Sequence, residues 1–141
     1  MRYYAVIDTN VLVSAMLKWE SVPGSIIDFA FEGIIIPLIN RKILDEYRTV
    51  LSRSKFGLPK DVVDAIVKAM ELRGLNVDES TLDIELPDPN DRVFFEVVME
   101  ERKTGDAYLV TGNMKHFPSK PFVVTPRQML DIILNTPDVF D

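Results

Sequence analysis

The sequence contains no cysteine and only one histidine among its 141 residues. Without cysteine, disulfide bonds and cysteine-bound zinc are excluded, and the composition fits a protein of the reducing cytoplasm. His116 alone supplies neither a histidine-rich metal site nor a catalytic triad. Its Lys-His-Phe-Pro context favours an ordinary loop histidine. The chemistry must therefore come from other side chains.

Long apolar runs and glycine-rich phosphate loops are also missing. No apolar run approaches the ~20 residues of a membrane-spanning helix, and the early acid Asp8 argues against a signal peptide. Gly24 and Gly33 match neither dinucleotide-binding nor Walker spacing. Hydrophobic residues make up 47% of the chain, which is enough for a full core. We expect one domain over 1–141.

The net charge of -6 argues against a protein that coats nucleic acid. The charge is unevenly distributed, however. Residues 41–60 carry six bases against two acids, a balance of +4, and residues 61–106 carry five bases against thirteen acids, a balance of -8. The basic segment could guide a polyanion to one place, or it could be a solvated helix face.

Apolar runs alternate with amphipathic stretches along the chain. The patterns predict strands at 3–7, 34–39, 108–111 and 122–124, and helices at 24–32, 41–53 (capped by Asn40), 60–73, from Asp88-Pro89 onward, and from Pro126 to about 135. Pro37 argues against a central strand at 34–39, because proline has no N–H to donate to a neighbouring strand. Residues 75–85 are ambiguous and could hold a short edge strand. Strands separated by helices predict an α/β fold, with a mainly parallel sheet and helices on both faces.

Two polar segments follow predicted strands directly. Asp8 ends the first strand, and Thr111-Gly112-Asn113 follows the strand at 108–111. Ligands of such folds bind at the carboxyl ends of the strands, so both segments belong to the expected ligand edge. The alternatives are a helix cap or a turn acid for Asp8, and an ordinary turn for the second segment.

Three further acids lie on predicted helices. Helical periodicity puts Glu46 at the margin of the apolar face of helix 41–53, while Asp45 points to water. Asp91 shares the buried face of the helix that begins at Asp88. A rim glutamate paired with a base would explain Glu46 equally well, and first-turn acids that complement the helix dipole would explain Asp88 and Asp91.

If Asp8, Glu46 and Asp91 converge, their charges cannot stay close without a counter-charge, because one carboxyl would take up a proton. A divalent cation removes that conflict. Oxygen ligands suit Mg²⁺ or Mn²⁺, which activate water and stabilise charge on a phosphoryl group.

Four elements in this order resemble the PIN-domain family: Asp8-Thr9-Asn10-Val11-Leu12-Val13-Ser14, Glu46, Asp88-Pro89-Asn90-Asp91, and Tyr108-Leu109-Val110-Thr111-Gly112-Asn113. The stretch 110–118 is most similar to the branch of toxin components of toxin–antitoxin systems. The resemblance covers residues 3 to about 130. It implies a three-layer α/β/α domain with a five-stranded sheet, Mg²⁺ or Mn²⁺ dependence, hydrolysis of single-stranded RNA, a homodimer, and a small antitoxin as partner.

The resemblance also assigns roles by position. It implies that Asp8, Glu46 and Asp91 form the acidic metal site, that Asn113 is a further ligand, and that Thr9, Asn10, Ser14, Asp88 and Thr111 support it. Many members of the family carry aspartate where this chain has Asn113. Asparagine brings no charge, so a second metal ion would be held weakly.

Basic residues of the segment 41–60 complete the expected RNA-binding surface, namely Arg41, Lys42, Arg53 and Lys55. Two other functions compete with ribonuclease activity. The neutral Asn113 and the negative net charge of the chain favour a non-catalytic module that binds RNA or a protein. A phosphoryl-transfer or receiver domain would also place an aspartate after a strand, but Asn10 stands where phosphatases of that type need a second acid.

Overall fold

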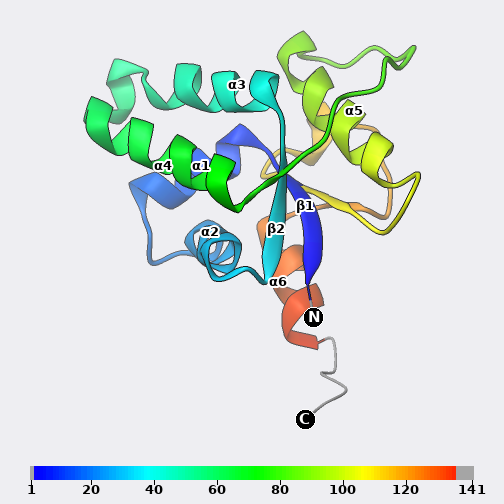
Figure 1. Ribbon diagram of the computed structural model, residues 1–141, viewed down its shortest axis with the longest axis horizontal. Helices are drawn as coiled ribbons and strands as arrows, with labels where there is room; N and C mark the ends of the chain where they lie inside the picture. Colours follow the sequence, from blue (N-terminus) through cyan, green and yellow to red (C-terminus); the bar gives the residue numbers. More distant parts are fainter. Residues whose placement is uncertain (1, 136–141) are drawn as a thin grey trace.

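A five-stranded sheet forms the centre of the chain, with the order β3-β2-β1-β4-β5. The computed structural model describes residues 2–135 (Figure 1). Every pair of neighbouring strands is parallel. The strands are β1 (Tyr3–Ile7), β2 (Ile35–Ile39), β3 (Leu75–Asn76), β4 (Tyr108–Val110) and β5 (Val123–Val124). The predicted parallel α/β sheet is therefore confirmed, with its carboxyl ends at one edge.

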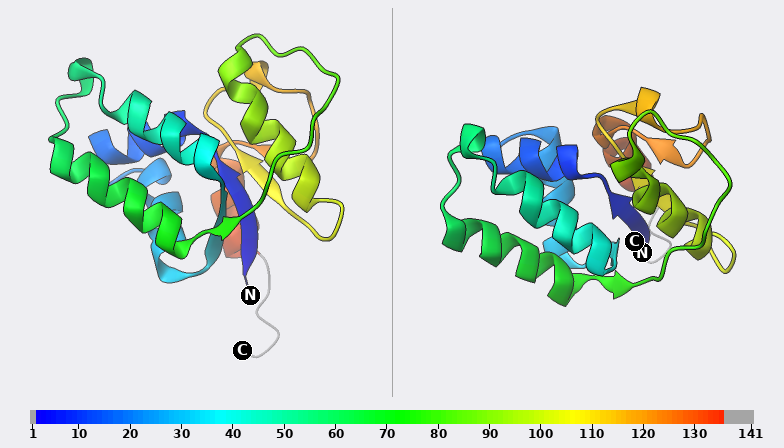
Figure 2. Two further views of the ribbon diagram at one scale, coloured as in Figure 1. Left: turned by 45° about the horizontal axis from the view of Figure 1, so that its top comes forward. Right: turned by 90° about the horizontal axis from the view of Figure 1, so that it is seen from above.

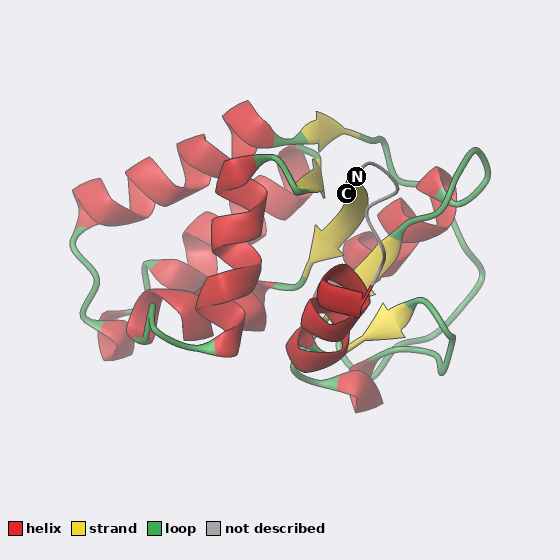
Figure 3. Cartoon of the chain, turned by 90° about the horizontal axis from the view of Figure 1, so that it is seen from below, coloured by secondary structure: helices red, strands yellow, loops and turns green. Residues whose placement is uncertain are grey.

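Helices cover both faces of the sheet. They are α1 (Thr9–Leu17), α2 (Val22–Glu32), α3 (Arg41–Leu51), α4 (Lys60–Arg73), α5 (Arg92–Glu101) and α6 (Pro126–Asn135), with short 3₁₀ turns η1 (Ser54–Phe56), η2 (Pro89–Asp91) and η3 (Met114–His116). Helix α5 packs across β1, β2 and β4, whereas α2 packs on β2 and α6 on β5. Figure 2 and the view from below in Figure 3 show α5 on the side of the sheet opposite α2 and α6. The chain thus has the predicted three layers.

The register of β1 and β4 brings two predicted site segments together. Ile7 pairs with Val110, and the backbone N–H of Asp8 donates to the Val110 carbonyl at 2.9 Å. Asp8 and Thr111 are therefore the first residues beyond two adjacent strands. Both strands are fully buried at this end, because the hydrophobic core surrounds them. The predicted ligand edge is confirmed for these two segments.

Helix α3 is tied to the same edge. The Asn40 side chain accepts from the Ile43 N–H at 2.9 Å, as the predicted cap requires. The fully buried Tyr47 donates its hydroxyl to the Ile7 carbonyl, one residue before Asp8. This contact holds α3 against the carboxyl end of β1. Glu46, the residue before Tyr47, therefore lies near the carboxyl edge of the sheet.

Most predicted elements agree with the structure, and the differences are local. Helix 60–73 and strand 3–7 have the predicted bounds, and Leu75–Asn76 forms the short edge strand. Helix 41–53 ends two residues early, at Leu51. Pro37 is accommodated within β2, where β3 pairs only with Leu38 and Ile39.

The prediction of an α-helix from Asp88-Pro89 was wrong in its first turn. Residues Pro89–Asp91 form a 3₁₀ turn, and the α-helix begins only at Arg92. The predicted cap itself is confirmed, because the Asp88 side chain accepts from the Asn90 N–H at 2.9 Å and Pro89 takes the first position of the turn. Helix α1, which begins directly after Asp8, was not predicted as an element of its own.

No helix among residues 2–135 combines the length and apolarity that a membrane crossing requires.

Candidate active site

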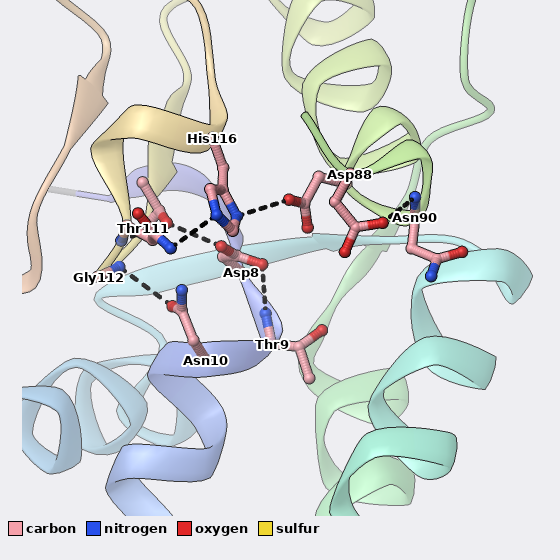
Figure 4. A network of polar contacts seen from close by, with 10 residues as sticks. Asp8, Thr9, Asn10, Asp88, Asn90, Thr111, Gly112 and His116 are labelled. Carbon is pink, nitrogen blue, oxygen red and sulfur yellow. Dashed lines mark hydrogen bonds and ion pairs between the residues drawn. The ribbon is translucent and has the colours of Figure 1, made fainter. Parts of the chain in front are cut away.

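Asp8 is the most buried acid at the carboxyl edge of the sheet, with 3% of its surface exposed. One carboxylate oxygen accepts from the Thr9 N–H at 2.8 Å, and the other accepts from the Thr111 hydroxyl at 2.7 Å. Figure 4 shows Asp8 between these partners, below His116. Asp8 therefore caps α1 with one oxygen, as one alternative predicted, and it lies at the carboxyl edge of the sheet, while its role in a site stays a prediction.

The pKa of Asp8 is raised from 3.8 to about 6. Burial is the largest cause, and the charge of Asp91 raises this pKa further. The hydrogen bonds from Thr111 and Thr9 oppose the rise because they stabilise the charged form. His116 opposes the rise to a smaller extent, so the balance of causes still disfavours the charged carboxylate, and a bound cation would favour it.

Asp91 and Asp88 face this edge from the 3₁₀ turn before α5. The Asp91 carboxylate lies 3.0 Å from the Nδ1 atom of His116 and is partly buried. Burial raises the pKa of Asp91, the charge of Asp88 raises it further, and His116 lowers it. Sequence reasoning treated His116 as a loop residue, but the structure brings it against Asp91.

Glu46 belongs to the same electrostatic neighbourhood. As predicted from helical periodicity, it is half-buried while Asp45 is exposed. Burial raises the pKa of Glu46, Arg53 lowers it, and the charges of Asp88 and Asp91 raise it. The charge of Asp91 therefore raises the pKa of both Asp8 and Glu46, although the three acids come from three different elements.

These acids are not gathered at ligand distance. Across residues 2–135, no group of three or more histidine, cysteine, aspartate or glutamate side chains is arranged to hold a metal ion. A cation shared by Asp8, Glu46 and Asp91 would require a closer approach of at least one of them. The assignment of these residues as metal ligands stays a prediction.

The donor chemistry of the site nevertheless fits a hard divalent cation. All three acids offer carboxylate oxygens, the ligands that Mg²⁺ and Mn²⁺ prefer. Beside Asp8, the hydroxyl of Thr9 is buried and has no hydrogen-bond partner in the described part of the chain. A buried polar atom without a partner is costly and rare, so it calls for a ligand atom or water.

Two of the five residues predicted to support the site, Asn10 and Ser14, line a pocket of about 250 Å³ between α1 and the loop after β4. Asn10 accepts from the Gly112 N–H at 3.0 Å through its side-chain oxygen and so joins α1 to the loop after β4. Ser14 and Asn113 line the same pocket. Asn113 is anchored by its own N–H, which donates to the Thr111 hydroxyl at 3.0 Å.

The four basic residues predicted to bind RNA are all exposed, but they do not share one surface. Lys42 lies with Glu46 in a pocket of about 260 Å³ and pairs with Glu79. Arg41 lines a different pocket of about 580 Å³ between α3 and α4, which contains none of the three predicted metal-binding acids. Arg53 lowers the pKa of Glu46, and Lys55 lies over the Phe56 ring. Their role in RNA binding stays a prediction.

Replacing Thr111 with valine is expected to lower the free energy of unfolding at neutral pH by about 1–3 kcal/mol. Valine keeps the shape but removes the hydroxyl that donates to Asp8 and accepts from the Asn113 N–H, and Thr111 is fully buried. Thr111→Ser keeps the hydroxyl and should lose about 1 kcal/mol for the missing methyl group. Urea denaturation of both variants measures the difference, and equal losses would contradict it.

A family model described as PIN domain matches residues 4–115 of the chain. The match includes Asp8 after β1, Glu46 on α3, Asp91 in the turn η2 and Thr111 after β4. Neither the comparison with curated proteins nor the comparison with solved structures gives a match. PIN domains are typically nucleases and generally use divalent metals, which agrees with an edge of coupled carboxylates. Because the match spans most of the sequence, the chain belongs to the PIN domain family.

Proposed function

We propose that the protein is a metal-dependent endoribonuclease that hydrolyses phosphodiester bonds of single-stranded RNA. The observation that carries the proposal is a set of partly or fully buried acids at one edge of the sheet whose charges raise one another's pKa. Beyond the effect of burial, Asp91 raises the pKa of Asp8, Asp88 raises that of Asp91, and both Asp88 and Asp91 raise that of Glu46. Repulsion between acids that come from separate elements opposes folding. A site for a divalent cation explains the arrangement.

In the proposed mechanism, Asp8, Glu46 and Asp91 would hold Mg²⁺ or Mn²⁺. Such an ion, when bound, supplies positive charge that offsets the charge of the reacting phosphoryl group and makes water a stronger nucleophile. Asp8 is the most rigid of the three acids, because the Thr9 N–H and the Thr111 hydroxyl fix both of its oxygens. Thr9 adds a buried hydroxyl beside it. Fixed oxygens reduce the reorganisation needed when RNA is bound and cut.

The substrate would reach the acids from the pockets on either side of them. Asn10 and Ser14 line the pocket of about 250 Å³, whose lining carries no formal charge. Lys42 and Arg92 line the pocket beside Glu46, where a phosphate backbone would compete for them with their ion-pair partners Glu79 and Glu96. Backbone binding of this kind should weaken steeply as the salt concentration rises.

Cleavage of a labelled single-stranded RNA by the full chain tests the proposal. We expect cleavage with Mn²⁺ or Mg²⁺ and none with a chelator, because the carboxylates alone cannot offset the charge of the phosphate. Double-stranded RNA and single-stranded DNA of the same sequence serve as comparison substrates. Cleavage that persists unchanged in the chelator would contradict a metal-dependent site.

A second candidate is a PIN-fold module that binds RNA or a protein partner without cutting. The lack of a ready group of three metal-binding side chains among residues 2–135 favours it, as does the neutral Asn113. RNA binding without cleavage at any Mn²⁺ concentration would support this function over the first.

The biological setting we propose is a toxin of a toxin–antitoxin pair, acting in the cytoplasm as a homodimer and neutralised by a small antitoxin. The similarity of residues 110–118 to that branch of the family supports the toxin role, and the lack of cysteine fits a reducing compartment. Growth arrest on expression, relieved when Asp8 is replaced, would be the expected cellular result.

A further inference from the structure

A continuous chain of hydrogen bonds connects Asp8 to Asp91 through the loop that follows β4. The Thr111 hydroxyl donates to Asp8 at 2.7 Å and accepts from the Asn113 N–H at 3.0 Å. The Asn113 side-chain nitrogen lies 2.9 Å from Nε2 of His116, and Nδ1 of His116 lies 3.0 Å from the Asp91 carboxylate. Figure 4 shows this path beside the end of β1. Two acids that are far apart in the sequence are thus linked by three intervening residues.

The chemistry of these groups makes His116 the donor to Asp91, whichever way the Asn113 amide is turned. The Asn113 side-chain nitrogen has two hydrogens and no lone pair, so Nε2 of His116 must accept from it. In a neutral ring the other nitrogen, Nδ1, then carries the hydrogen and donates to Asp91. If the Asn113 amide were turned over, Nε2 would donate instead, and Nδ1 could face the carboxylate only by also carrying hydrogen. In both arrangements His116 is a donor to Asp91.

No other group holds the Asp91 carboxylate in the described part of the chain, where its one side-chain hydrogen bond is the contact with His116. The Asp91 backbone N–H bonds to the Asp88 carbonyl and leaves the side chain free to rotate. The direction of the Asp91 carboxylate therefore depends on the histidine. Asp8, by contrast, is held by two donors of its own.

We propose that His116 is a positioning residue, which turns the Asp91 carboxylate toward Asp8 and holds it there through Asn113 and Thr111. This inference rests on the proposed metal-dependent function, because it concerns how two acids are presented to one cation. The positioning role of His116 also explains why the side chain at position 113 is a neutral amide. An aspartate at 113 could not donate to Nε2, whereas the amide can, so the Asn113–His116 pair serves to orient Asp91.

The ring of His116 can be observed directly, since the untagged chain contains no other histidine. Nitrogen-15 NMR of the metal-free protein is expected to show hydrogen on Nδ1 and an Nε2 atom that accepts a hydrogen bond. Asp91→Ala should shift the ring away from this form. A ring with hydrogen mainly on Nε2, or one that exchanges freely between both forms in the wild-type protein, would overturn the inference.

Variants of His116 test the consequence for metal binding. His116→Asn keeps an amide nitrogen close to the position of Nδ1, while His116→Ala removes the donor. We expect the Kd for Mn²⁺, measured by calorimetry, to rise about 10- to 100-fold in His116→Ala and only about threefold in His116→Asn, in line with other partners that orient metal ligands. Lys115→Ala, in the same turn, is the control and should bind Mn²⁺ as the wild type does.

A purely structural role would lower the unfolding temperature of both His116 variants and leave the Kd unchanged, which would overturn the inference. Wild-type Mn²⁺ affinity in His116→Ala would do so as well, while the proposed function would stand. Failure of the wild-type protein to bind Mn²⁺ at all would instead overturn the proposed function, and the role of His116 with it.

Discussion

Replacing Asp8 with asparagine is expected to abolish metal-dependent RNA cleavage while the fold is retained. Asparagine has the same shape and can still accept from the Thr9 N–H or the Thr111 hydroxyl, so the local geometry survives. The negative charge that would hold the cation is lost. The expected loss is on the order of a thousandfold, because a metal ligand contributes more than the 10- to 100-fold typical of its hydrogen-bond partners.

Asp45→Asn is the matched control for this experiment. It removes the same charge from an exposed position on α3, in the pocket between α3 and α4 and away from the coupled acids. Its cleavage rate should stay within about twofold of the wild type, since surface charges contribute little to a distant site. If Asp8→Asn cleaved RNA as fast as the wild type, the site proposed here would be ruled out.

The ligand edge was predictable because parallel strands bring their carboxyl ends together whatever their order. Asp8 and Thr111 follow short apolar runs, and each run is long enough to be recognised as a buried strand. Glu46 was predictable for a similar reason, since its position relative to the core depends only on the helical repeat around it. In each of these cases the decisive information lies within a few neighbouring residues.

The local structure was harder to predict where the same residues suit two different elements. Helix α1 follows β1 without a break, and Val11 and Val13 favour strands as much as helices. The cap at Asp8 is the only local sign of the change, and it also had a functional reading. The 3₁₀ turn before α5 was not predicted, because a cap at Asp88 followed by Pro89 suits a 3₁₀ turn and an α-helix alike.

No local sequence pattern could predict the contact between His116 and Asp91. The two residues are 25 positions apart and lie on two short 3₁₀ turns that no periodicity reveals. The available signals were that His116 is the only histidine and that it stands three residues after the neutral Asn113. The sequence alone predicted that Asn113 is an uncharged metal ligand that would hold a second ion weakly. The structure shows a hydrogen-bond partner for the ring.

The burial of Asp8 predicts a dependence of stability on pH that differs between the wild type and Asp8→Asn. The pKa of Asp8 is raised to about 6 in the folded chain, mainly by burial. Below about pH 4 the carboxyl is protonated in both the folded and the unfolded state, and it costs nothing. Above about pH 6 it is charged in both states, and the folded state carries a cost of about 3 kcal/mol. The free energy of unfolding should therefore fall across this window in the wild type.

Urea denaturation in a chelator, with both proteins at a series of pH values, measures this effect. Glu79 and Glu100 have lowered pKa values, so their ion pairs lose stability as the pH falls, but they do so equally in both proteins. The difference between the two proteins isolates Asp8. It should grow in favour of Asp8→Asn by about 3 kcal/mol from pH 4 to above pH 6. A difference in the free energy of unfolding that does not change with pH, or that favours the wild type at high pH, would contradict a destabilising charge on the buried Asp8.

Mn²⁺ should reverse this difference if Asp8 is a metal ligand. An ion at a hundred times its Kd stabilises the state that binds it by about 2.7 kcal/mol, which is close to the cost of the buried charge. At neutral pH we therefore expect Mn²⁺ to raise the stability of the wild type and to leave that of Asp8→Asn nearly unchanged. Equal stabilisation of both proteins would mean that the ion binds elsewhere, and that the cost of the Asp8 charge is offset by something other than a metal.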